Sequence, residues 1–144
     1  MFLYASVVKE YSPASEGINW SQVLIYLFSV NIREATQAAL AFLINLNEMS
    51  HEEVEVFLFN GVIERAIINS DRMDTELTQM LLSLVLSLSE TNPRNLKILL
   101  TMSSLLQLIH QIFRANSSTL CVMIFKLLVA SIQLNSNRIS LMLY

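Results

Sequence analysis

Residues 74–100 read DTELTQMLLSLVLSLSETNPRNLKILL, and this stretch decides the fold. A long apolar segment leads to a polar turn, and a second apolar segment follows the turn. Asn92 can cap a helix with its side chain, and Pro93 suits the first helical position, where its missing N–H costs nothing. The stretch therefore predicts a long helix that ends near Glu90, a sharp turn and the start of a second helix.

The apolar segment of this stretch has near-copies on both sides. Residues 80–89 (MLLSLVLSLS) align with residues 38–47 (AALAFLINLN) and with residues 123–132 (MIFKLLVASI), so that the copies begin 42 and 43 residues apart. A helical unit that recurs with a period in the low forties is typical of a stacked helical solenoid. We therefore expect three long helices that occupy equivalent places in successive units.

Composition supports an all-α chain. The 144 residues include only two Gly and two Pro, and 53 % of them are hydrophobic. Because Gly and Pro mark loops, their scarcity favours helices joined by short turns. Charged residues make up 15 %, against roughly 25 % in an average globular domain. We therefore expect part of the apolar surface to be covered by more of the protein, by a second copy or by a partner.

Polar residues divide the chain into helices at regular places. Each predicted helix start carries a side chain that can accept a hydrogen bond from a free backbone N–H. Gly61 can adopt the positive φ of a tight turn between helices. The predicted helix starts are at Asn19, Asn31, Ser50, Asp71 or Asp74, and Asn92, and the predicted turns are at Asn60-Gly61, Ser103-Ser104 and Asn116-Ser117-Ser118.

Two parts of the chain are expected. Residues 1–18 form a short N-terminal helix and a turn, with a possible capping role, and residues 19–144 form the repeat domain, with about two full and two partial units. Asn135 begins one more helix, which corresponds to the first helix of a further unit. A solenoid normally ends in a polar cap, so two interpretations stay open. Either the chain is a fragment of a longer one, or a partner covers this end.

The helical units resemble the armadillo repeat of importin-alpha and the beta-catenin family. The matching segments are residues 54–67 (VEVFLFNGVIERAI), residues 40–46 (LAFLINL) and the polar starts at Asn92 and Asn135. The resemblance implies a right-handed superhelix of three-helix units. HEAT repeats share the period and are the second choice, but they usually have two helices in each unit.

The resemblance also implies a concave groove, lined by the third helix of each unit, that binds an extended peptide or a partner helix. The Trp/Asn pairs of importin-alpha would fall at positions 41/45, 83/87 and 126/130, where only Asn45 matches. Side chains about four residues apart share one side of a helix, and here they are mostly small or polar. The opposite, apolar side carries Leu40, Leu43, Leu84, Leu88, Leu127 and Leu128. The predicted groove residues are Gln37, Ala41, Asn45, Gln79, Ser83, Ser87, Val122, Lys126 and Ala130.

The alternative function is a structural subunit or a homo-oligomeric scaffold that assembles through its apolar C-terminal helix. The residues of this possible end-to-end interface are Ile139, Leu141, Met142, Leu143 and Tyr144.

The charge distribution bears on partners. Residues 1–90 carry twelve acidic and four basic side chains, whereas residues 91–144 carry five basic and no acidic ones. This charge asymmetry is expected either to guide an acidic protein partner to the C-terminal half or to favour head-to-tail contact between copies of the chain. Five scattered basic residues do not make a nucleic-acid surface, so nucleic acid is not an expected partner.

Sequence motifs for chemistry are missing. The sequence has no Gly-rich phosphate loop, no Cys/His metal spacing and no nucleophile elbow. His51 belongs to a helix start, and His110 follows an apolar run, where a partly buried, hydrogen-bonded side chain is expected. We therefore predict no enzyme activity, no catalytic residues, no metal site and no cofactor.

The expected location is intracellular, in the cytoplasm or the nucleus. The N-terminus lacks the charged start and the cleavage site of a signal peptide. The longest uncharged runs are shorter than the roughly 20 residues that a membrane span needs. The single cysteine, Cys121, cannot form an internal disulfide and fits a reducing compartment.

Overall fold

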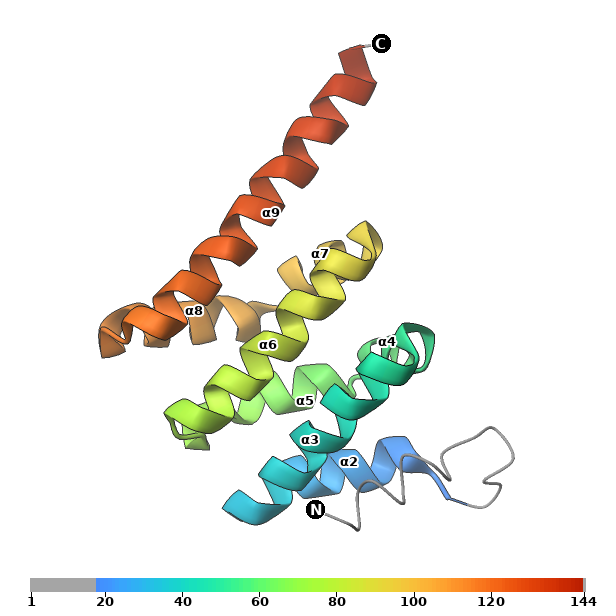
Figure 1. Ribbon diagram of the computed structural model, residues 1–144, viewed down its shortest axis with the longest axis vertical. Helices are drawn as coiled ribbons and strands as arrows, with labels where there is room; N and C mark the ends of the chain where they lie inside the picture. Colours follow the sequence, from blue (N-terminus) through green and yellow to red (C-terminus); the bar gives the residue numbers. More distant parts are fainter. Residues whose placement is uncertain (1–17, 144) are drawn as a thin grey trace.

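The protein is all-α, as its composition predicts. The computed structural model describes residues 18–143, and the side chains of residues 18–133. This part of the chain forms eight α-helices and one 3-10 helix, with no strand (Figure 1). The predicted N-terminal helix and turn fall almost wholly in residues 1–17, outside the described residues. The elements are α2 (Trp20–Ser29), α3 (Arg33–Met49), α4 (His51–Phe59), α5 (Val62–Ile68), η1 (Asn69–Arg72), α6 (Thr75–Thr91), α7 (Pro93–Leu100), α8 (Ser103–Ala115) and α9 (Ser118–Leu143).

The three longest helices lie side by side. α3, α6 and α9 run in the same direction, from lower left to upper right in Figure 1, and α6 contacts both of its neighbours. The three near-copies of sequence lie within these helices. A second row behind them consists of α2, α5 and α8, in which α5 contacts both α2 and α8. α4 follows α3 and α7 follows α6, and each contacts the long helix that precedes it.

Three predicted helix starts have the expected capping contacts. The Asn19 side chain accepts a hydrogen bond from the backbone N of Gln22 at 3.2 Å. Asp74, rather than Asp71, caps α6 by accepting from the backbone N of Leu77 at 2.9 Å. Asn92 accepts from the backbone N of Arg94 at 3.0 Å, with proline at the first turn of α7. Each contact satisfies a backbone donor that has no partner inside the helix.

Two predicted starts are different. Asn31 does not cap α3, because α3 begins after Ile32 and has no side-chain cap. Asn31 instead adopts a left-handed conformation (φ 56°) directly after α2, where it ends that helix. Asparagine tolerates this conformation better than most residues. Ser50 stands at the cap position of α4, but its side chain makes no capping hydrogen bond.

Two of the three predicted turns contain a residue in the left-handed conformation. Gly61 has φ 83° between α4 and α5, and Asn116 has φ 56° between α8 and α9. The predicted turn at Ser103-Ser104 is wrong, because the chain turns at Thr101 and Met102 and α8 begins at Ser103. The predicted break at Asn135 is wrong, because α9 continues from Ser118 to Leu143. Asn and Ser cost only about 0.5 kcal/mol each in a helix interior, so a short polar run does not by itself end a helix.

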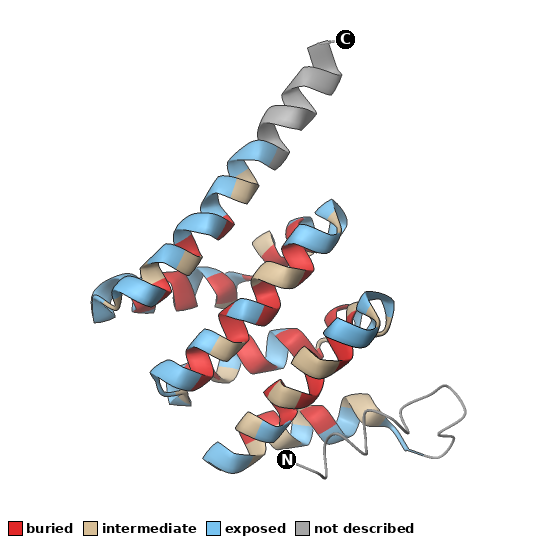
Figure 2. Ribbon diagram, viewed as in Figure 1, coloured by how far each residue is buried: buried red, intermediate tan, exposed pale blue. Residues whose placement is uncertain are grey.

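Buried residues of both rows of helices, coloured red in Figure 2, make up the core. Trp20 stacks on Phe42, with ring centroids 5.5 Å apart, and Phe42 meets the edge of Phe57 at 6.5 Å. The predicted apolar side of the long helices is buried at Leu40, Leu43, Leu84, Leu88 and Leu127. Leu128 is the exception, because 37 % of it is exposed on α9.

No single helix among the described residues is long and apolar enough to cross a membrane. Within the same residues, α7 and α8 together have the length and apolar composition of a span, but the two helices are bent by 80° at their junction.

Candidate interaction surface

The nine predicted groove residues all reach the surface. Gln79, Ser83, Val122 and Lys126 are exposed, and the other five are half-buried. They come from three helices that lie side by side. Within each helix, the spacing of roughly four residues places its three members on one face. We call these nine residues the third-helix face. It has no ionisable group other than Lys126, so it offers small side chains, amides and hydroxyls to a partner.

Several residues of this face already bond within the chain. The Asn45 side-chain nitrogen donates to the backbone oxygen of Ala41 at 2.9 Å. The Ser87 hydroxyl accepts from the side chain of Asn47 at 2.6 Å. Gln37 accepts from Arg33 at 3.1 Å. By contrast, Gln79 and Ser83 are exposed, and their side chains make no hydrogen bond to other residues that the structure describes, so the middle of the face is the part most open to a partner.

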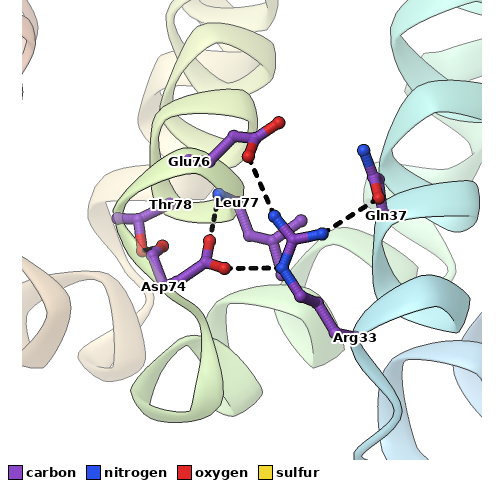
Figure 3. A network of polar contacts seen from close by, with 6 residues as sticks. All are labelled: Arg33, Gln37, Asp74, Glu76, Leu77 and Thr78. Atoms are coloured by element: carbon purple, nitrogen blue, oxygen red, sulfur yellow. Dashed lines mark hydrogen bonds and ion pairs between the residues drawn. The ribbon is translucent and has the colours of Figure 1, made fainter.

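A polar network that sequence reasoning missed joins the first turns of α3 and α6 (Figure 3). Arg33 Nε contacts Asp74 Oδ2 at 2.6 Å, and Arg33 Nη2 contacts Glu76 Oε2 at 2.9 Å. Arg33 points from α3 toward the two carboxylates of α6 in Figure 3. The separation of about one repeat between the partners is the only sequence signal for this network.

The network shifts the pKa values of Asp74 and Arg33. Hydrogen bonds from the Leu77 backbone N–H and from Arg33 lower the pKa of the Asp74 carboxyl. The hydrogen bond to Asp74 raises the pKa of the Arg33 guanidinium. Both shifts favour the charged forms. The groups are solvent-exposed and therefore strongly screened, so the network orients the helices more than it stabilises them.

A second polar link joins α3 to α6 near their other ends. Asn47 is buried, and its side chain donates to Ser87 while its oxygen lies 2.9 Å from His51 Nδ1. His51 itself is exposed, as expected of a helix start. His110 is also exposed, so the expectation of a partly buried side chain there is wrong.

A buried amide connects α4, α6 and α7. Asn95 is fully buried, and its side-chain nitrogen donates to Glu55 Oε1 at 3.2 Å and to the Leu88 backbone oxygen at 3.1 Å. Arg94 lies over the Phe59 ring, 5.0 Å from its centroid. These contacts explain the polar start at Asn92-Pro93-Arg94-Asn95 as a structural joint between units.

Three surface hollows lie away from the third-helix face. The largest of these three has a volume of about 440 Å³ and opens between the α4–α5 turn and the α7–α8 turn, beside Phe59, Gly61 and Thr101. The other two, each of about 160 Å³, are lined in part by Asp74 and by Arg33. None of the three includes a residue of the third-helix face. No group of three or more His, Cys, Asp or Glu side chains that could hold a metal ion occurs within the described part of the chain.

Comparisons of the chain with protein-family models, with curated proteins and with solved structures each found no match. The resemblance to armadillo repeats therefore stays a prediction. The predicted end-to-end interface also stays untested, because the side chains of Ile139, Leu141, Met142, Leu143 and Tyr144 lie outside the described residues.

Proposed function

We propose that this chain is a non-enzymatic protein–protein interaction scaffold, built as an armadillo-like right-handed superhelix. Its partner, a peptide or a helix, binds along the third-helix face. One observation carries this proposal: three near-copies of one helix lie side by side and present small and polar side chains at the surface. Grooves that bind extended peptides in repeat proteins are built in this way.

The order of the helices favours three-helix units over two-helix units. α4 and α5 precede the long helix α6, and α7 and α8 precede the long helix α9. In each case a short turn joins the first two helices, with Gly61 at the cap position before α5 and Met102 at the cap position before α8. This order supports the armadillo interpretation over the HEAT interpretation.

The test of this function begins with a partner that can be measured. Peptides are selected from a display library on the intact chain, and the dissociation constant of the best peptide is determined by fluorescence anisotropy. Ser83→Arg and Ala41→Arg are each expected to weaken binding roughly tenfold or more, because a bulky cation at the centre of an interface displaces the partner. The melting temperature of Ser83→Arg should equal that of the unchanged chain, because Ser83 is exposed.

Gln107→Arg is the matched control, since Gln107 is exposed on α8 in the other row of helices. It adds the same charge and bulk and is expected to leave binding unchanged. If both groove variants bind selected peptides as tightly as the control does, the third-helix face is not the binding surface.

A further inference from the structure

The outer side of α9 is an exposed apolar stripe. Val122, Phe125, Val129 and Ile132 are all exposed, and Phe125 and Ile132 are each 66 % exposed. Their spacing of three, four and three residues places them along one side of the helix. Single exposed apolar residues are ordinary, but a continuous row of large ones marks a surface that another molecule covers. We call these four residues the α9 stripe.

Earlier copies of this helix bury the positions of two stripe residues, Phe125 and Ile132, and that of the neighbouring Leu128. The positions of Val122 and Val129 are exposed or half-buried in those copies. Phe125 and Leu128 of α9 correspond, 43 residues earlier, to Leu82 and Val85 of α6, which are 1 % and 0 % exposed. One repeat earlier again, the corresponding residues of α3 are Leu40 and Leu43, both fully buried.

The third position of this set behaves in the same way. Ile132 corresponds to the buried residues Ser89 and Asn47. α3 is contacted by α4 and α6, which follow it in the chain, and α6 is contacted by α7 and α9. The molecule thus contains two examples of how a helix covers these positions, and on α9 the same positions are uncovered.

We infer that the α9 stripe is a docking site for an amphipathic helix of a partner protein, with acidic residues beside its apolar face. This inference goes beyond the proposed function, because the third-helix face spans three helices and the stripe follows the outer side of one. The two surfaces share only Val122. Helix-in-groove recognition needs apolar anchors at spacings of three and four residues, and the stripe has this spacing.

Charge favours an acidic partner. Lys126 is exposed and lies within one turn of Val122 and Val129. Arg114, at the end of α8, is also exposed. The chain has no acidic residue after Glu90. Acidic residues beside the apolar face of the partner would therefore be attracted to Lys126, which raises the association rate and selects the partner.

A second copy of the chain fits the stripe less well. In a head-to-tail stack, α3 of the next copy would pack on the α9 stripe as α9 packs on α6. It would have to use the face that corresponds to the α6-facing side of α9. The Phe42 side of that face is already buried, with Trp20 stacked on it. In a symmetric antiparallel pair of α9 helices centred on Leu127, the two copies of Lys126 would lie close together. α9 carries no acidic residue that could compensate them.

The binding test uses three synthetic peptides of 17 residues, the length of α6. The first carries leucines at the spacing of Leu77, Leu81, Leu84 and Leu88 on a glutamate-rich background, because α6 buries these side chains. The second has the same leucines on a lysine-rich background, and the third is a scrambled version of the first. Labelled peptides are titrated with the intact chain and followed by anisotropy. The acidic peptide should bind roughly tenfold more tightly than the basic one, and the scrambled peptide should not bind.

Variants locate the binding on the stripe. Phe125→Ser and Ile132→Ser should each raise the dissociation constant of the acidic peptide roughly tenfold or more. The circular dichroism and melting temperature of the chain should not change. Tyr26→Ser is the matched control, because Tyr26 is an aromatic residue with similar exposure, 65 %, on the distant helix α2. Ser83→Arg should leave this binding unchanged, which separates the stripe from the third-helix face.

Three results would overturn the inference. The first is failure of the acidic peptide to bind, and the second is equal binding of the acidic and basic peptides. The third is sedimentation of the chain as a dimer that Phe125→Ser converts to a monomer, because a second copy would then occupy the stripe. Sedimentation as a monomer, together with selective binding of the acidic peptide, supports it.

Discussion

Two contacts between long helices can be compared within this molecule: the seam between α3 and α6, and the seam between α6 and α9. Both join helices that run in the same direction and derive from near-copies of one segment (Figure 1). Each of the three helices carries buried leucines, including Leu40 on α3, Leu82 on α6 and Leu127 on α9. The apolar part of the contact is therefore common to both.

The polar parts differ. The α3–α6 seam has Arg33 paired with Asp74 and Glu76 near one end, and Asn47 bonded to Ser87 near the other. At the equivalent places, the α6–α9 seam has uncharged residues. They are Thr75 in place of Arg33, Ser117 and Thr119 in place of the two acids, and Ser89 and Ala130 in place of Asn47 and Ser87.

Ser89 illustrates the consequence of this difference. Its hydroxyl donates to the Leu86 backbone oxygen in its own helix at 2.7 Å, and Ala130 has no polar group to offer. The comparison teaches that apolar burial is sufficient to stack two of these helices, because the second seam forms without the polar links. Directional bonds at both ends of the first seam add a preferred register, since hydrogen bonds depend on geometry and apolar burial does not.

The largest expected effect tests the shared apolar part. Leu40→Ala and Leu82→Ala should each lower the free energy of unfolding by about 2–5 kcal/mol, because both side chains are buried and leave a cavity. Phe125→Ala, at the equivalent exposed position of α9, should change it by less than about 0.5 kcal/mol. Urea unfolding of the three variants, followed by circular dichroism, measures these differences.

One outcome would contradict the comparison directly. If Phe125→Ala is as costly as Leu82→Ala in dilute solution, the side chain is buried in the isolated chain. The two sides of the stack would then not differ as described.

A smaller effect tests the polar link. Asn47→Ala should cost about 1–3 kcal/mol, because a buried hydrogen-bonding side chain and its contact to Ser87 are both lost. Ser89→Ala, the equivalent change in the second seam, should cost less than about 1 kcal/mol, since Ser89 bonds only within its own helix. Urea unfolding of both variants is the measurement. Equal losses would show that the link between α3 and α6 adds nothing to the stability of its seam.

Much of the fold could be predicted from the sequence, because its signals are local. Apolar spacing gave the three long helices, and side-chain capping gave the starts at Asn19, Asp74 and Asn92. Asn31 was misplaced because asparagine suits both the start of a helix and the left-handed residue after one. The break at Asn135 was wrong because helix propensities are weak and a polar run can stay helical.

The candidate surface could be predicted only in part. Helix periodicity correctly brought the nine residues of the third-helix face to the surface. Periodicity does not give the register between helices, so the contact of Arg33 with Asp74 could not be found. Nor does it tell which equivalent positions have a covering helix, which is why Leu128 was expected on the apolar side and is partly exposed.

The smallest expected effect is the response of the first seam to acid. The folded chain lowers the pKa of Asp74 through the Leu77 N–H and Arg33, so the unfolded chain binds a proton at this group more readily than the folded chain. The group's contribution to stability is therefore present above its unfolded pKa of about 3.9 and is lost as the pH falls through the folded value. Between pH 7 and pH 2, roughly the titration range of a carboxyl, the melting temperature of Asp74→Asn should fall by less than that of the unchanged chain. Asp71→Asn is the control, because Asp71 is a nearby exposed carboxyl that does not cap α6, and its melting temperature should fall as much as that of the unchanged chain. If the melting temperatures of both variants fall equally, the Arg33 network contributes nothing specific to the α3–α6 contact.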